Sequence, residues 1–340
     1  MIDIDEETLQ DIINIKTGLF FPLDGFMDSK DYRSVVDSMK LSTGEVWTIP
    51  ITFDIDELID DEEIILYFNH KEVAKIEVED IYKTKDDDIE KIFGTTDTNH
   101  PGVQKELKRK KYRVGGKISL LDDTILQGAL DPKKTKEYFR TKGWNTIAGF
   151  QTRNAPHKAH EYLHRLALEF CDALFINPLV GWKKKGDFTQ EAVEVGYKKI
   201  NEVYYNNLNI YFETLKTPMR YAGPKEAIFH AIIRKNLGCT HFIIGRDHAG
   251  VGDYYGVYEA QELAKKLQDD LDIKILLFKE PYYCRVCEQI VSKNCCSHKD
   301  IDKISGTKIR KMLMSNQIPP KEFMRREVAQ EVLKLKNIFI

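Results

Sequence analysis

The sequence predicts an α/β protein with a β-rich first part and a second part built on a parallel sheet. Before residue 140, short segments alternate apolar and polar residues with the two-residue period of strands, and turn residues separate them. After residue 140, short apolar runs alternate with segments of helical periodicity, which is the order of a doubly wound sheet. The chain has 340 residues, enough for two domains.

The first part contains four predicted β segments. Residues 46–55 (VWTIPITFDI) alternate apolar residues with Thr, Pro and Asp, as in a strand with one buried face. Residues 63–68 and 73–82 flank the polar stretch 69–72, which predicts a hairpin. Residues 112–121 (YRVGGKISLL) add a further strand. Short strands separated by turns predict a small barrel or sandwich.

An acidic run followed by a basic run lies between the last two of these strands. The basic residues 105–113 have two interpretations, a surface that binds a polyanion or an ordinary solvated surface. The second is favoured because charged runs are usually solvated.

The second part alternates predicted strands and helices. Buried strands are predicted at 146–150, 173–180, 241–245 and 273–278, and helices from about Pro156 to Cys171, at 224–238 and at 257–268. Pro224 in a first turn and Gly238 at a helix end support the middle helix. Ligands bind beyond the carboxyl ends of such strands, so the loops after Phe150, Gly245 and Phe278 should share one site.

The loop at residues 151–160 (QTRNAPHKAH) is the first candidate site. Asn154 is a predicted N-cap and Pro156 a first-turn residue, which places His157 and His160 on one face of the helix start. The N–H groups and the dipole of a helix N-terminus favour an anion. Arg153 adds a planar donor fork suited to an oxyanion. This pattern predicts phosphate binding by the histidines.

Two other interpretations of the histidine pair stay open. A zinc site is disfavoured because Lys158 follows His157 and no third ligand is near, whereas a metalloprotease needs Glu there and a spacing of four. The alternative is a purely structural role. His164, one turn further on, is predicted to be a packed or surface histidine.

Residues 245–256 (GRDHAGVGDYYG) form a second candidate loop. Its four glycines allow the backbone to approach a ligand closely and to expose N–H groups. Arg246 and His248 add donors, and Asp247 is expected to pair with Arg246 or to orient a ribose hydroxyl.

Residues 304–313 (ISGTKIRKML) form a third candidate segment. They predict a short helix capped by Ser305 or Thr307, with Lys308 and Arg310 in its first turn. A plain helix start with a basic surface is the alternative.

Several familiar motifs do not occur in the sequence. It contains no GxxxxGK[ST] P-loop, no GxGxxG after a strand, and no indicated Ser-His or Cys-His pairing. Oxyanion sites without a nucleophile predict transfer between two bound substrates, driven by positioning and charge neutralisation.

Composition narrows the class of protein further. The formal net charge of −3 gives no reason to expect a nucleic-acid partner. The acidic N-terminus and the lack of a long apolar run predict a cytoplasmic protein with no membrane segment.

Four of the six cysteines gather within residues 284–298 (CRVCEQIVSKNCCSH). In a cytosolic chain this favours a metal over disulfides. The pattern Cys284, Cys287, then Cys295 or Cys296, then His298 is typical of structural zinc, which would brace the following segment. The sequence leaves open which later cysteine is the ligand, and an iron–sulfur cluster or unpaired thiols are the alternatives.

Five ordered segments together resemble the ATP sulfurylase (sulfate adenylyltransferase) family. The segment FFPLDGFM at 20–27 is also similar to that family's first domain. The five segments are QTRNAPHKAHE at 151–161, NPLVGWKKKGD at 177–187, MRYAGPKEA at 219–227, HFIIGRDHAG at 241–250 and ISGTKIR at 304–310.

The resemblance implies a PUA-like N-terminal β-barrel and a Rossmann-like nucleotidyltransferase domain with a parallel sheet. It implies conversion of ATP and sulfate to adenylyl sulfate (APS) and pyrophosphate, in either physiological direction, with Mg²⁺ accompanying the nucleotide. In the family, a sulfate oxygen attacks the α-phosphorus directly, which agrees with the missing nucleophile. A zinc site like the one predicted here is found in some members.

The resemblance also implies roles for individual residues. Gln151 and Arg153 would hold sulfate with the backbone N–H of Ala249, Thr152 and Asn154 would act near the α-phosphoryl group, and His157 and His160 would bind the phosphates. Pro281 is expected as a backbone contact to adenine, in a segment (FKEPYYC) that departs from the family's small apolar pattern. The expected ATP-binding residues are Gln151, Thr152, Arg153, Asn154, His157, His160, Gly245, Arg246, Asp247, His248 and Pro281.

The expected division of the chain follows these motifs. Residues 1–138 form the PUA-like domain, residues 139–302 the catalytic domain with the zinc segment at 284–298, and residues 303–340 a helical segment. The short stretch after ISGTKIR predicts no kinase-like extension, and the family suggests a homodimer or larger homo-oligomer. The alternatives are a nucleotidyltransferase of the same fold with another acceptor, and an RNA-binding protein that uses a PUA-like domain and a zinc knuckle.

Overall fold

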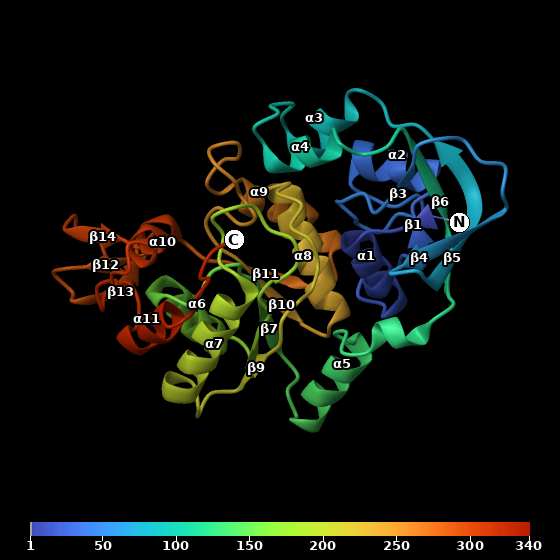
Figure 1. The fold of residues 1–340 in the computed structure, drawn as a ribbon. Helices are drawn as coiled ribbons and strands as arrows, with labels where there is room; N and C mark the ends of the chain where they lie inside the picture. Colours follow the sequence, from blue (N-terminus) through green and yellow to red (C-terminus); the bar gives the residue numbers. More distant parts are fainter. Residues whose placement is uncertain (1) are drawn as a thin grey trace. The chain divides into compact units, whose positions relative to one another are not determined.

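The computed structural model (Figure 1) describes residues 2–340. This part of the chain divides into two compact units. The first unit contains residues up to Lys142 together with Lys216–Gly238 and Asp247–Lys274. The second contains Gly143–Leu215, Cys239–Arg246 and Ile275–Ile340. Within residues 2–340, every helix is too short or too polar to cross a membrane.

The first unit contains a six-stranded, mainly antiparallel sheet in the order β1-β4-β5-β6-β2, with β3 beside β6. Its strands are β1 Ile2–Asp3, β2 Gly25–Phe26, β3 Phe53–Ile55, β4 Glu63–Phe68, β5 Lys71–Tyr82 and β6 Tyr112–Leu120. Its helices are α1 Glu6–Lys16, α2 Ser29–Ser38, α3 Asp88–Phe93, α4 Pro101–Glu106, α5 Pro132–Thr141, α8 Pro224–Asn236 and α9 Glu259–Leu267, with 3₁₀ turns η1 Asp123–Leu126 and η2 Gln268–Asp270.

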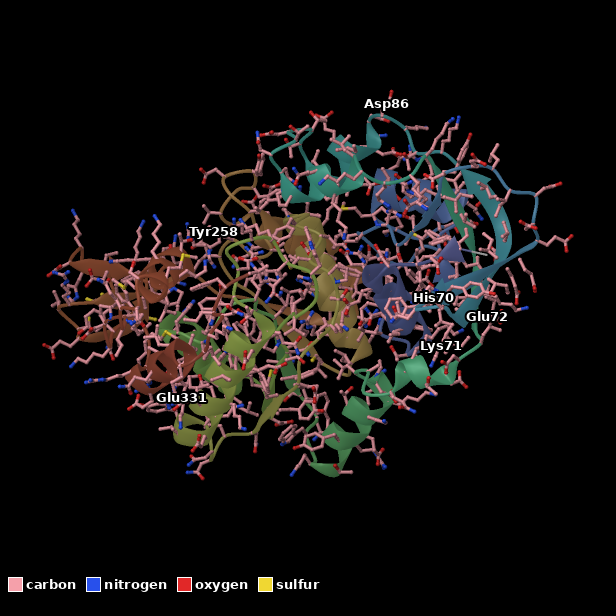
Figure 2. The ribbon with its side chains drawn as sticks, viewed as in Figure 1. His70, Lys71, Glu72, Asp86, Tyr258 and Glu331 are labelled. Atoms are coloured by element: carbon pink, nitrogen blue, oxygen red, sulfur yellow. The ribbon has the colours of Figure 1, made fainter. Side chains whose placement is uncertain are left out.

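The predicted hairpin is confirmed as β4 and β5. Asn69 and His70 form its two-residue turn, and both have positive φ angles, 51° and 63°. This geometry suits the right-handed twist of paired strands. Figure 2 labels His70 in the turn with Lys71 and Glu72 at the start of β5.

The predicted strand at residues 46–55 is largely wrong. Only Phe53–Ile55 pairs as a strand, with β6, while the residues before it follow an irregular path. Trp47 N–H donates to Met39 O, and Met27 N–H donates to Ile51 O. The apolar residues of this segment are buried, as the alternation predicts. Its backbone N–H and C=O groups, however, form single hydrogen bonds with loop residues instead of pairing with a neighbouring strand.

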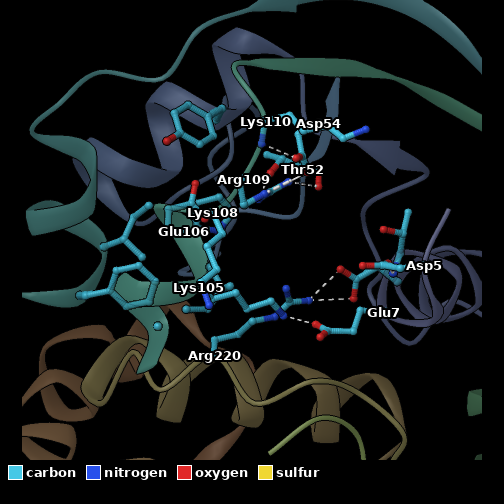
Figure 3. Close-up of a pocket in the computed structure, with 18 residues that line it drawn as sticks. Asp5, Glu7, Thr52, Asp54, Lys105, Glu106, Lys108, Arg109, Lys110 and Arg220 are labelled. Atoms are coloured by element: carbon cyan, nitrogen blue, oxygen red, sulfur yellow. Dashed lines mark hydrogen bonds and ion pairs between the residues drawn. The ribbon is translucent and has the colours of Figure 1, made fainter. Parts of the chain in front are cut away.

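The basic run at residues 105–113 is a solvated surface only in part, because Lys108, Lys110 and Lys111 are exposed whereas the other basic residues are paired inside the unit. It contributes to the wall of a cavity of about 360 Å³ in the first unit (Figure 3). Arg109 donates to Asp54 and Thr52 at 2.7–3.1 Å, and Arg113, only 2% exposed, donates to Glu106 at 2.7 Å. Carboxylates inside the unit therefore neutralise the positive charge of these two arginines.

The same cavity contains a second set of ion pairs. Arg220 Nη2 contacts both carboxylate oxygens of Asp11, at 2.7 and 2.8 Å, and Lys105 is hydrogen-bonded to Glu7 (Figure 3). Asp11 and Glu7 come from α1, whereas Arg220 lies two hundred residues later. The pair thus fixes the segment before α8 to the N-terminal helix within this unit.

The second unit contains a five-stranded sheet in the order β11-β10-β7-β8-β9. The pairs β10–β7, β7–β8 and β8–β9 are parallel, as predicted. The strands of this unit are β7 Ile147–Phe150, β8 Ala173–Ile176, β9 Ile210–Phe212, β10 His241–Ile244, β11 Lys274–Leu277, β12 Pro281–Cys284, β13 Gln289–Ser292 and β14 Ile301–Lys303, and its helices are α6 Lys158–Leu168, α7 Gln190–Tyr204, α10 Gly306–Met314 and α11 Arg326–Leu333.

Helix α6 occupies the centre of the second unit. Its buried side chains share one apolar core with β7, β8, α7, α10 and α11. α6 also contacts β12 and β13 of a separate three-stranded sheet, β13-β12-β14. A helix held on several sides by packing is a rigid base for residues at its first turn.

We predict that the Asp11–Arg220 pair stabilises the first unit. Asp11→Ala leaves a largely buried guanidinium without its carboxylate, so we expect the free energy of unfolding to fall by about 3 kcal/mol. Urea denaturation followed by circular dichroism measures the change. Lys108→Ala, an exposed residue that lines the same cavity, is the control and should change it by less than ~0.5 kcal/mol. Equal effects in the two variants would contradict this role.

Candidate functional site

The candidate site lies at the carboxyl edge of the parallel sheet in the second unit. β7 is flanked by β10 and β8, and Phe150 at its end is paired with Ile176 at the end of β8. The loops that follow these parallel strands therefore leave the sheet at one edge. The expectation that the loop after Phe150 carries functional residues rests on this geometry.

Helix α6 begins with a histidine cap. His157, in extended conformation, is its N-cap residue, and its Nδ1 accepts the backbone N–H of His160 at 3.4 Å. The prediction that Asn154 caps this helix is wrong, because its Oδ1 accepts a 2.7 Å hydrogen bond from Arg310 Nη1 instead. In a neutral ring that accepts at Nδ1, the hydrogen sits on Nε2, which remains a donor.

His157 and His160 stack on each other within the second unit. Their ring centroids are 3.6 Å apart, the planes differ by 23°, and the residues are 7% and 9% exposed. Burial lowers the pKa of His157 to about 4, with a further contribution from the positive charge of Arg310. Burial lowers the pKa of His160 well below its usual value, and electrostatic repulsion from His157 and His164 lowers it further. Both imidazoles are therefore neutral near pH 7.

His164 is a packed histidine, one of the two roles predicted for it. Its ring is fully buried, and its Nδ1 is 2.9 Å from the hydroxyl of Tyr205. The ring lies against Phe150 with a centroid distance of 4.4 Å. Burial lowers the pKa of His164 to about 3, so this ring also stays neutral and supports the packing below His160.

The residues between Phe150 and His157 form a compact turn. Thr152 is buried, and its Oγ1 accepts the backbone N–H of Asn154 at 3.1 Å. Gln151 and Arg153 are partly exposed. Arg153 Nε lies 3.6 Å from the Oδ2 of Asp187, a carboxylate that the sequence did not single out. Asp187 follows β8, and its place at the carboxyl edge of the sheet is the signal that could have identified it.

The segment 304–310 meets the first loop in the second unit. Besides its bond to Asn154, Arg310 donates to Thr307 Oγ1 at 3.2 Å. A Cβ on Gly306 would lie 3.6 Å from Asn154 Nδ2, so α10 begins next to the loop. The predicted cap is only half right, because Ser305 occupies the N-cap position without a side-chain hydrogen bond.

The glycine-rich loop after β10 is divided between the two units. Gly245 and Arg246 belong to the second unit, where Arg246 Nη1 lies 3.3 Å from Glu280 Oε1. Asp247 and Ala249 belong to the first unit, and both have left-handed backbones, with φ of 51° and 56°. Non-glycine residues adopt this conformation seldom, and such positions concentrate at functional sites.

His248 has its own partner within the first unit. Its Nε2 lies 3.3 Å from Nδ1 of His230, a buried residue of α8. The left-handed loop therefore carries one histidine that contacts a helix of the same unit.

Three cysteines and one histidine of the second unit converge beside β12 and β13. The ligand atoms of Cys284, Cys287, Cys296 and His298 all lie within 4.8 Å of one another. Their sulfur–sulfur contacts are 3.5 and 3.7 Å, close to the ~3.7 Å between thiolates that share a tetrahedral zinc at about 2.3 Å. The donor set and the spacing therefore fit zinc.

Cys295 is outside this cluster. Its Sγ is 3.7 Å from Ser292 Oγ and 3.8 Å from the hydroxyl of Tyr162. Of the two candidates in sequence, only Cys296 lies within ligand distance of the other three residues.

Pro281, the expected adenine contact, begins β12, the strand that leads to the cluster, and is paired with Ser292 in β13.

Comparisons with known proteins agree for both parts of the chain. Residues 127–335 match the family model ATP-sulfurylase, and residues 1–123 match that of a PUA-like domain. The sulfate adenylyltransferase of Hyperthermus butylicus is 48% identical over 341 residues, covering 97% of this chain and 87% of that protein. The sulfate adenylyltransferase of Thermococcus onnurineus is 46% identical and covers 100% of this chain and 91% of its own.

A solved structure supports the fold. The hexameric APS kinase from Thiobacillus denitrificans matches with a TM-score of 0.74 over 98% of this chain and 62% of that one. At 17% sequence identity, this similarity concerns the fold alone.

We predict that the buried imidazole of His157 makes stability depend on pH. Between pH 6.5 and about 4, the unfolded chain binds a proton at His157 that the folded protein does not, so stability falls as the pH falls. This group contributes a slope of up to ~1.4 kcal/mol per pH unit in that window. His157→Asn retains a capping acceptor and should reduce the slope, measured by urea unfolding at several pH values. Identical slopes in the two proteins would contradict the neutral, buried state.

Proposed function

The chain belongs to the ATP-sulfurylase family and has sulfate adenylyltransferase activity, and we propose that it transfers the adenylyl group by direct attack of sulfate on ATP. A sulfate oxygen forms a bond to the α-phosphorus, the bond between the α-phosphorus and the bridging oxygen breaks, and pyrophosphate leaves with that electron pair. No proton has to move and no enzyme nucleophile is required. The observation that carries this proposal is the neutral, stacked histidine pair beside Arg153 in one loop.

In this proposal the histidines act as neutral donors. Each imidazole offers one N–H to an oxygen of the β- or γ-phosphate, at the N-terminus of α6, whose dipole favours negative charge. Because both rings are buried and fixed by stacking, they need no reorganisation when charge builds on the leaving pyrophosphate. Preorganised donors of this kind supply about 3 kcal/mol of transition-state stabilisation each.

Arg153 and Gln151, both in the second unit, bind the sulfate dianion. A guanidinium offers the planar, multi-donor geometry that suits a tetrahedral oxyanion. Thr152 and Asn154 act near the α-phosphoryl group, where the link from Arg310 to Asn154 keeps the turn in shape. Gly245, Arg246 and Pro281 complete the ATP-binding set of the second unit, with Pro281 as the adenine contact. For Asp247, His248 and the Ala249 N–H of the first unit, we retain the substrate-binding roles that the family resemblance implies.

Two metals belong to the proposal. Mg²⁺ accompanies ATP as part of the substrate and neutralises phosphate charge. Zinc is held by Cys284, Cys287, Cys296 and His298 in a closed structural site that cross-links β12 to the segment before α10. We also infer a homodimer or larger oligomer, a cytoplasmic location, and the division at residues 138 and 302.

The function is tested by pyrophosphate release from Mg·ATP, with and without sulfate and with molybdate as a mimic. We expect release only with an oxyanion, and we expect Arg153→Ala to abolish it while ATP binding persists, because the positive charge that binds sulfate is lost. Lys142→Ala, an exposed residue, is the control with wild-type turnover. Oxyanion-independent release would contradict the function, and equal loss of ATP and sulfate binding would contradict the role of Arg153.

The metal site is tested by a matched pair of cysteine variants. Cys296→Ser should lower the zinc-to-protein ratio of the purified protein and its thermal midpoint, because one of four ligands is lost. Cys295→Ser, the neighbouring residue outside the cluster, should retain wild-type zinc content. Zinc loss in the second variant and retention in the first would assign the ligand to Cys295 instead, and no zinc in the wild type would overturn the site.

A further inference from the structure

We propose that Asp187 is a positioning residue that orients Arg153 for the oxyanion, and that residues 337–340 hold Asp187 in place. The inference rests on the proposed function, because it concerns the arginine assigned to sulfate. Asp187 lies in the second unit, is 1% exposed, and its Oδ2 is 3.6 Å from Arg153 Nε. A carboxylate this deeply buried needs a cationic or hydrogen-bonding partner, and Arg153 is one.

The contact constrains the guanidinium in a specific way. A negative charge at the Nε edge restrains both the side-chain torsions and the plane of the group, so it fixes the direction in which the rest of the guanidinium points. A long, partly exposed arginine would otherwise sample many rotamers, and each binding event would have to order it. Asp187 thus stabilises the oxyanion complex by organising its donor beforehand, without touching the substrate.

The loop that carries Asp187 is held by backbone pairing with the end of the sequence. Gly186 N–H donates to Ile340 O, Ile340 N–H donates to Asp187 O, and Thr189 N–H donates to Ile338 O, each at 2.9 Å. The last four residues therefore lie alongside 186–189 as a short antiparallel ladder, with an isolated bridge between Phe188 and Phe339.

Side chains reinforce this ladder from both sides. The rings of Phe188 and Phe339 pack with centroids 4.8 Å apart, and Phe188 is fully buried. Lys183, itself buried, donates from Nζ to Phe188 O at 2.6 Å. The backbone of Asp187 is consequently fixed by contacts on either side, so its carboxylate cannot follow Arg153 if the arginine swings away. Asp187 is therefore the fixed member of the pair and Arg153 the member whose position is set.

The test is a double-mutant cycle on steady-state kinetics. Asp187→Asn keeps the volume and removes the charge, and we expect it to reduce kcat/KM for sulfate at least tenfold while the KM for Mg·ATP stays within twofold. Arg153→Lys should reduce kcat/KM for sulfate more strongly. If Asp187 acts through Arg153, the double variant will lose less than the product of the single losses. Multiplicative losses, or an unchanged kcat/KM for sulfate in Asp187→Asn, would overturn the inference.

A second variant tests the ladder and covers the case in which Asp187→Asn does not fold. Phe339→Ala should raise the KM for sulfate severalfold and leave the KM for Mg·ATP unchanged. Phe339→Leu should raise the KM for sulfate less than Phe339→Ala does, because leucine fills part of the space left by the ring. Lys336→Ala, exposed and outside the ladder, is the control. Equal changes in both KM values for Phe339→Ala would indicate general loosening and overturn the positioning role.

The same experiments separate this inference from the proposed function. If Arg153→Lys leaves the KM for sulfate unchanged, the sulfate role of Arg153 fails and the inference fails with it. If Arg153→Lys raises that KM and Asp187→Asn does not, the proposed function stands and only the positioning role is wrong.

Discussion

Burial of two stacked imidazoles at the start of α6 is the constraint on which the candidate site depends. A protonated pair 3.6 Å apart in an enclosed position would suffer both desolvation and mutual repulsion, so the rings are neutral. Neutral imidazoles are weaker donors than imidazolium, but they cost little to bury. The positive character of the site comes instead from the helix terminus, Arg153 and Arg310. The fold thus separates the histidines, which shape the candidate site, from the groups that supply its positive charge.

The segment after residue 300 builds this arrangement as much as the sheet does. Lys158 N–H at the first turn of α6 donates to Phe323 O at 2.8 Å, and Glu161 in the same turn pairs with Arg325 at 2.8 Å. The Arg325 guanidinium lies 3.9 Å from the ring centroid of Tyr204 on α7. Arg310 holds the preceding loop through Asn154. The start of α6 is therefore fixed by contacts more than 150 residues away in the chain.

Local signals in the sequence predicted the β4–β5 hairpin, the strands β7, β8, β10 and β11 and the helices α6, α8 and α9, because apolar periodicity and Pro or Gly boundaries act over a few residues. They failed where a distant residue decided the outcome. Asn154 would cap α6 if Arg310 did not take its oxygen, so His157 caps the helix instead. The choice of Cys296 over Cys295 depends on the turn after Ser292, whose carbonyl accepts both backbone N–H groups. The position of Asp187 after β8 could have drawn attention to it, but no local signal shows the backbone ladder that its loop forms with residues 337–340.

Direct transfer between bound substrates is tested most directly by isotope exchange. Labelled pyrophosphate is incubated with ATP, Mg²⁺ and the protein, and label entering ATP is measured with and without sulfate. If sulfate itself attacks the α-phosphorus, no adenylyl–enzyme forms, and label appears in ATP only when sulfate is present. Exchange in the absence of any oxyanion would require an adenylyl group held on the protein, and it would contradict a site that works through neutral histidine donors and an oriented arginine alone.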